Sequence, residues 1–166
     1  PSGRHFSGHG SYSVDGRTLF TSEVENESGA GTIGMWNTDH YTRKGGFPSG
    51  GIGPHEILRL ADGATLAVAN GGIIAALDDD RSKLNTDTMT PNLTYLTLEG
   101  TVLEQVSLPK ALHQNSIRHL AAAPDGTVAF AMQWEGDPAV SPPLLGLHKR
   151  CKAVILAARP DHLALG

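Results

Sequence analysis

Histidine and carboxylate side chains are the residues of this 166-residue chain that could carry out chemistry together. Eight histidines are present, and imidazole is a good ligand for zinc, copper, iron and nickel. A histidine beside a carboxylate can instead act as a general acid or base on a small substrate. The sequence contains no HExxH motif of a helical zinc site. Any joint site must therefore be assembled by the fold from distant segments.

Other kinds of chemistry have weaker support. The single cysteine, Cys151, excludes an internal disulfide and a CxxC metal or redox motif. No serine lies in a GxSxG motif. The glycine-rich segment 50–54 precedes no predicted helix that would supply a phosphate site, so it predicts a tight turn.

Composition argues against two classes of partner. The net charge is −4, and the basic cluster formed by Lys149, Arg150 and Lys152 is typical of a solvated hairpin turn. A nucleic-acid-binding protein usually has a basic excess or a basic face. No apolar run approaches the roughly 20 residues that cross a bilayer. We therefore expect neither nucleic-acid binding nor a membrane span.

An internal repeat indicates how distant histidines could meet. Three segments each contain a short strand, an Asp-Gly turn and a second strand, with the turns at residues 15–16, 62–63 and 125–126. Asp-Gly between alternating hydrophobic residues is a strong hairpin signal. A second hairpin follows each one and closes at or near a proline, which cannot extend a strand ladder. These prolines are Pro48, Pro109 and Pro160.

Four strands per roughly 40–50 residues are typical of β-propeller blades. We therefore predict an all-β fold, a partial β-propeller of about three four-stranded blades that forms a single fragment over residues 1–166. The blades are expected at 9–48, 55–109 and 119–160, with a loop inserted at 71–92 that carries an acidic run at 78–80. Because propellers have about four to eight blades, this fragment would need flanking blades or self-association to close a ring.

The first strand of each blade lines the channel of a propeller, so the residues near its start should meet at one rim. We predict a divalent transition metal (iron, copper or zinc) held by His9, His55, His119 and Glu56. Other residues expected at this rim as ligand or partner contacts are Arg4, His5, Glu23, Asn70, His113, Arg118, Gln133 and Glu135. His40, His148 and His162 should lie on outer hairpins or the tail. The alternative is structural: the channel histidines would only satisfy backbone groups of neighbouring blades.

Several segments resemble known repeats and one bacterial family. Residues 47–56 and 62–72 resemble YVTN propeller repeats. More narrowly, the chain resembles an uncharacterised bacterial family, domain of unknown function family 1513. The segments that carry this resemblance are GRHFSGHG at 3–10, GPHE at 53–56, KLNTDTM at 83–89, LHQNSIRHL at 112–120 and QWEGD at 133–137.

The resemblance implies a seven-bladed propeller, of which this chain is the middle, exported to the bacterial periplasm by a twin-arginine signal. It also implies genes near those for periplasmic iron uptake. We therefore expect a periplasmic propeller that binds a transition metal or an iron-uptake partner at the channel rim. Two alternatives stay open: a lactonase- or hydrolase-like enzyme that uses the same rim, and a pure protein-interaction scaffold.

Overall fold

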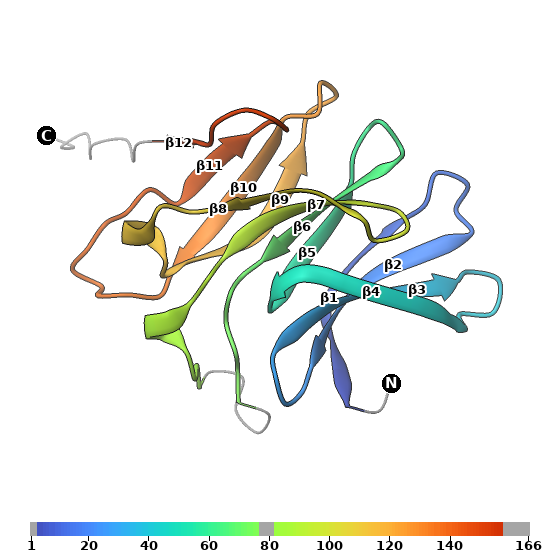
Figure 1. Cartoon of the computed structure of the whole chain (residues 1–166), viewed down its shortest axis with the longest axis horizontal. Helices are drawn as coiled ribbons and strands as arrows, with labels where there is room; N and C mark the ends of the chain where they lie inside the picture. The colour runs from blue at the N-terminus through green and yellow to red at the C-terminus, as the bar shows by residue number, and fades with distance from the viewer. Residues whose placement is uncertain (1–2, 77–81, 158–166) are drawn as a thin grey trace, which may run out of the picture.

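Three four-stranded antiparallel sheets make up the fold in a computed structural model, which describes residues 3–76 and 82–157 (Figure 1). In each sheet the strands lie side by side in chain order. The first sheet contains β1 (Arg4–Tyr12), β2 (Thr18–Glu25), β3 (Ala30–Asn37) and β4 (Arg43–Ile52). The second contains β5 (Pro54–Arg59), β6 (Thr65–Asn70), β7 (Asn92–Thr97) and β8 (Val102–Ser107). The third contains β9 (Asn115–Ala122), β10 (Val128–Trp134), β11 (Leu145–His148) and β12 (Ile155–Ala157).

The regular structure is otherwise limited to two short 3₁₀ helices in the described residues, η1 (Thr86–Thr88) and η2 (Lys110–Leu112). Within those residues no helix is long and apolar enough to cross a membrane. The predicted all-β class, a partial propeller of three blades, is confirmed.

The three Asp-Gly turns have the same local structure, which explains the repeat. The aspartate carboxylate accepts a hydrogen bond from the backbone N–H two residues later, at 3.1 Å from Asp15 and 2.9 Å from both Asp62 and Asp125. The glycine that follows has φ of 70°, 74° and 84° in the three turns. A side chain strains this left-handed conformation, so glycine is required there.

The middle blade is buried on both faces, because a blade packs on either side of it. All six residues of β6 are buried. Leu66 and Val68 pack toward the first sheet, with Phe20, Ile33, Ile57 and Leu96. Ala67 and Ala69 point the other way, where their small side chains leave room for the rings of Tyr95 and Phe130.

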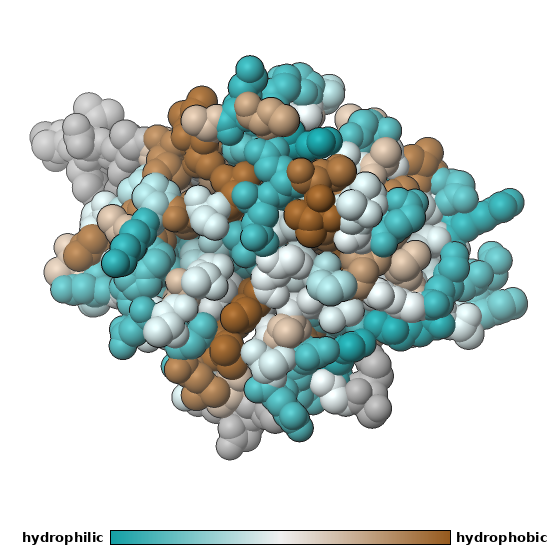
Figure 2. Space-filling model, in the orientation of Figure 1, coloured by the Kyte–Doolittle hydropathy of each residue, from teal (hydrophilic) through white to brown (hydrophobic). Residues whose placement is uncertain are grey.

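The outer faces of the first and third blades are not covered by other described residues. Phe6 of β1 is 52% exposed, and Leu145 and Ile155 of the third sheet are 44% and 64% exposed. Figure 2 shows this apolar surface at the upper left, over β11 and β12. Exposed apolar blade faces of this kind are expected to pack against a neighbouring blade.

Three strand limits differ clearly from the prediction, one of them that of β9, which begins at Asn115 rather than at His119. β1 begins at Arg4 rather than near His9, since glycines and a bulge hide its alternation. β4 continues past Pro48 to Ile52. Pro48 is tolerated because β4 is the outermost strand of its sheet, where a backbone N–H can face away from the ladder. The closing proline expected at Pro160 lies outside the described residues.

The inserted loop at 71–92 is not a simple excursion into solvent. It contains η1 and a bridge between Ala75 and Lys83. Asn85 fixes the later part of the loop to its start, since its side chain accepts a hydrogen bond from Ile74 N at 2.7 Å and donates one to Gly72 O at 2.8 Å. The acidic run at 78–80 lies outside the described residues.

Candidate metal site and adjoining pocket

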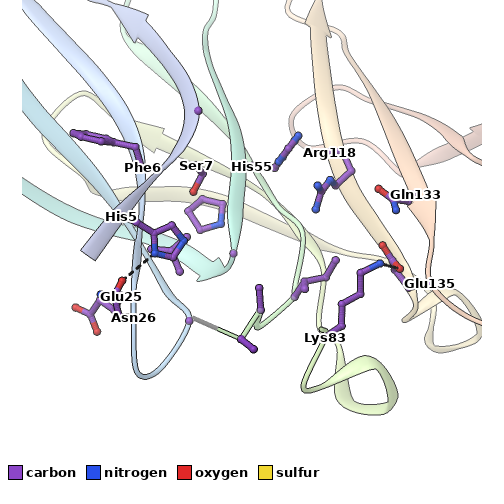
Figure 3. A pocket seen from close by; sticks show the side chains of 18 residues that line it. His5, Phe6, Ser7, Glu25, Asn26, His55, Lys83, Arg118, Gln133 and Glu135 are labelled. Carbon is purple, nitrogen blue, oxygen red and sulfur yellow. Dashed lines mark hydrogen bonds and ion pairs between the residues drawn. The ribbon is translucent and has the colours of Figure 1, made fainter. Parts of the chain in front are cut away.

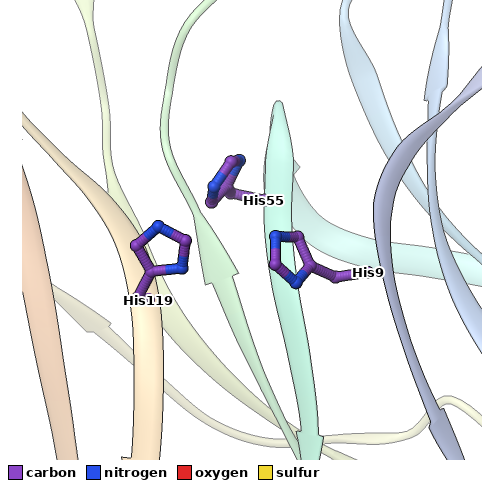
Figure 4. A group of neighbouring side chains, drawn as sticks. All are labelled: His9, His55 and His119. Atoms are coloured by element: carbon purple, nitrogen blue, oxygen red, sulfur yellow. The ribbon is translucent and has the colours of Figure 1, made fainter.

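Three histidines from three different sheets meet where the innermost strands adjoin. His9 is on β1, His55 on β5 and His119 on β9, and β5 contacts both β1 and β9. One ring nitrogen from each histidine lies within 4.8 Å of the others (Figure 4). The ring centroid of His55 is 4.9 Å from those of His9 and His119, which are 5.6 Å apart.

A β-bulge occurs at or beside each of these histidines. In β1 the register jumps between Phe6 and Gly10, and His9 lies inside the irregular segment. In β5 the register jumps between Pro54 and Glu56, so His55 is the extra residue. In β9 the jump falls between Ile117 and His119. Bulges bend a strand and redirect side chains, and here an irregularity in each of the three strands lies at or next to the histidine of the cluster.

A serine links two of these bulges. The Ser22 hydroxyl lies 3.2 Å from the backbone oxygen of His9 and 3.4 Å from that of His55. Ser22 is fully buried between the first two blades. The relative position of the two histidine-bearing segments therefore depends on a hydroxyl that sequence analysis did not single out.

The environment keeps His55 neutral. Burial, helped by the charges of Arg118, His9 and His119, lowers the pKa of His55 to about 4. A histidine with this pKa carries no proton on one ring nitrogen near neutral pH. That free lone pair is what a metal ion requires.

Glu56 lies behind this cluster rather than in it. Its Oε2 atom is 3.3 Å from Nδ1 of His119 and accepts a hydrogen bond from Leu120 N at 2.8 Å. It is not one of the grouped ligand atoms. This differs from its predicted role as a direct ligand, because its carboxylate is engaged by His119 and by the backbone N–H of Leu120. Glu56 is instead placed to orient the His119 ring.

A pocket of about 690 Å³ adjoins the cluster, and His55 contributes to both (Figure 3). Its polar wall includes His5, Arg118, Gln133 and Glu135, which were all predicted at the rim. Lys83 from the inserted loop also lines the pocket and forms an ion pair with Glu135. Sequence analysis missed Lys83, because nothing local indicates that the loop returns to the channel.

The first residues of β1 form the edge of the pocket. Arg4 forms an ion pair with Glu25 at 3.1 Å. Nδ1 of His5 lies 2.9 Å from Oδ1 of Asn26. Both predicted rim residues therefore lie near the pocket, with partners from the end of the first hairpin.

Three other predicted rim residues lie elsewhere. Glu23 is fully buried inside the first blade, where Arg43 is 3.2 Å away. Asn70 is buried between the first two blades, and Ser49 donates a 2.6 Å hydrogen bond to it. His113 caps η2 and lines a separate pocket. Each departs from the rim because its side chain faces a neighbouring element rather than the channel.

His148 lies on an outer strand as expected but is buried. Its Nδ1 is 2.9 Å from the hydroxyl of Tyr95, and its Nε2 is 2.9 Å from the backbone oxygen of Lys152. These contacts link β11 to the second blade. They account for both ring nitrogens, so His148 has a structural role.

Together, the three sheets and the histidine cluster define a β-propeller segment with a candidate metal site at its channel. The chain belongs to the family "Protein of unknown function (DUF1513)", which matches residues 1–165. No curated protein is similar to it in sequence.

Solved structures support the propeller-like fold. Hydrazine synthase from Kuenenia stuttgartiensis is similar with a TM-score of 0.51 and 12% identity, over 86% of this chain and 50% of that one. Dihydro-heme d1 dehydrogenase NirN, in complex with DHE, is similar with a TM-score of 0.53 and 13% identity, over 91% of this chain and 28% of that one. The chain thus spans half or less of these proteins, and at such low identity the likeness concerns the fold alone.

Proposed function

We propose that this propeller segment binds a divalent transition metal ion through His9, His55 and His119. The observation that carries the proposal is the convergence of three ring nitrogens, one from each blade, within 4.8 Å. Three imidazoles suit zinc, copper, iron or nickel, and they leave at least one coordination position open.

The donor set fits such an ion after a small adjustment. With zinc–nitrogen bonds of about 2.05 Å and tetrahedral angles, neighbouring ligand nitrogens are about 3.3 Å apart. The histidine nitrogens, at up to 4.8 Å, would need to approach by about 1.5 Å at most. Rotations of exposed side chains supply movements of this size, and His119 is 61% exposed. Glu56 would hold the His119 ring through Nδ1, which leaves Nε2 to face the ion.

Three further proposals concern the setting. The uncovered apolar faces of the first and third blades support closure of the ring by additional blades. The family resemblance supports a periplasmic location and partners among iron-uptake proteins. Both of the latter proposals depend on the resemblance and not on the geometry of the site.

A direct test compares two triple variants of the tag-free protein. Titration with Zn²⁺ by isothermal calorimetry at pH 7.5 should give one site per chain. Replacement of His9, His55 and His119 by alanine should weaken it more than about 100-fold, because loss of ligands exceeds the 10–100-fold effect of losing a supporting residue. The matched control replaces the three other described, non-buried histidines, His5, His40 and His113, and should leave the affinity unchanged.

The proposal fails if the first triple variant, folded by circular dichroism, binds Zn²⁺ as the wild type does. It also fails if both triple variants lose affinity equally, because binding would then follow histidine number rather than the cluster.

A further inference from the structure

The guanidinium of Arg118 lies in the pocket without a carboxylate partner. Among the described residues no carboxylate oxygen lies within 4.0 Å of it. Figure 3 shows its side chain between His55 and the Lys83–Glu135 pair. Burial lowers the pKa of Arg118, and the charge of Glu135 partly offsets this decrease. A half-buried guanidinium has lost hydration that an anion can replace.

Each carboxylate that lines the pocket has a cation partner, although Oε1 of Glu135 is buried without a hydrogen-bond partner among the described residues. Glu135 forms its ion pair with Lys83, and Glu25 forms one with Arg4. The glutamate side chains are 6% and 40% exposed, respectively. Among the described residues that line the pocket, Arg118 is therefore the cation that has no carboxylate partner.

Part of the pocket lining is apolar. Val24 comes from the end of β2, Pro54 begins β5, and Ile73 belongs to the inserted loop. The pocket volume of about 690 Å³ is within the range of small-molecule sites, about 300–1,000 Å³. A cavity with one available cation and an apolar wall is complementary to an organic anion rather than to an inorganic ion alone.

We propose that this pocket binds a small organic carboxylate, with its carboxylate on Arg118 and its apolar body against Val24, Pro54 and Ile73. Arginine is suited to this because its planar fork matches a carboxylate with two parallel hydrogen bonds. The proposal goes beyond metal binding and does not require it. Because His55 is shared, a bound cation should strengthen anion binding, and the anion should strengthen cation binding equally.

The test uses ¹⁹F NMR titrations with 4-fluorobenzoate and its neutral counterpart, 4-fluorobenzamide, in EDTA. The acid should bind about tenfold or more tightly than the amide. Arg118→Gln should lower the affinity for 4-fluorobenzoate about tenfold or more, because a charge-assisted contact is lost. The control variant is Arg17→Gln, because Arg17 lies at the first Asp-Gly turn, outside this pocket. It should bind the acid as the wild type does.

Two outcomes would overturn the proposal: no detectable binding of 4-fluorobenzoate to the wild type, or unchanged binding by a folded Arg118→Gln variant. A double variant, His9→Ala with His119→Ala, separates this site from the metal site, because neither residue lines the pocket. It should lose zinc and retain 4-fluorobenzoate. A failure to bind zinc would therefore refute the metal site but not the anion site. A failure to bind 4-fluorobenzoate would refute the anion site but not the metal site.

Discussion

Glu56 should control metal affinity without binding the metal. Its Oε2 atom contacts Nδ1 of His119 at 3.3 Å and Leu120 N at 2.8 Å. Glu56→Gln keeps an oxygen that can accept both hydrogen bonds but removes the negative charge. Glu56→Ala removes the acceptor and releases the ring. The two variants therefore separate the effect of charge from the effect of orientation.

The expected losses differ in size. A hydrogen bond to a charged group exceeds a neutral one by about 1 kcal/mol, so Glu56→Gln should weaken zinc binding about fivefold. Loss of a carboxylate that supports a histidine ligand typically costs 10–100-fold. His119 is 61% exposed and Glu56 20% exposed, so solvent screening weakens the contact between them. We therefore expect Glu56→Ala to weaken zinc binding about tenfold, at the lower end of that range.

The assay is a zinc competition titration against a chromophoric chelator at pH 7.5 and about 0.15 M salt, where charge screening is physiological. Glu25→Gln is the matched control, since Glu25 also pairs with a cation at the rim but does not contact a histidine of the cluster. It should bind zinc as the wild type does. Urea unfolding of all variants shows whether any loss of affinity reflects loss of structure.

The order of affinities decides the outcome. A zinc affinity that falls from the wild type to Glu56→Gln and again to Glu56→Ala supports a role for Glu56 in orienting His119. Equal affinity in all three proteins would refute it. So would a loss in Glu56→Gln as large as that of replacing His119 itself, because Glu56 would then act as a ligand.

Two predictions concern stability. Gly146→Ala would place a Cβ 2.1 Å from Cζ of Phe130, which is 1% exposed, and should lower the free energy of unfolding by about 1–3 kcal/mol; an unchanged urea midpoint would contradict this packing. The pKa of His55 falls from 6.5 to about 4 on folding, so the native state binds fewer protons. The free energy of unfolding should therefore fall as the pH drops from 6.5 to 4, by ~1–2 kcal/mol after solvent screening. His55→Gln, measured in EDTA, should lose this part of the pH dependence; an identical profile would exclude it.

Much of the fold follows from local signals in the sequence. The Asp-Gly turns depend on a single side chain and on one glycine with positive φ, so they form independently of distant segments. Their spacing sets the number of strands per blade. The convergence of His9, His55 and His119 also follows, since equivalent positions in successive blades lie at equivalent depths in the channel.

Details of the site did not follow from the sequence. Glu23 and Asn70 were expected at the rim, but an equivalent place along a strand does not specify which neighbouring element a side chain faces. Glu56 was expected as a ligand for the same reason. His113 was placed at a strand start that in fact forms η2.

The sequence by itself thus determined the architecture, because turns, strand periodicity and the blade repeat depend on neighbouring residues. Only the tertiary structure decided the chemistry. It brought Lys83 from the inserted loop to Glu135, left Arg118 without a carboxylate among the described residues, and set Glu56 behind His119. These arrangements depend on contacts between residues 50 or more positions apart, such as Lys83 with Glu135 and Glu56 with Leu120. No local pattern encodes such contacts, because they arise only when the blades pack.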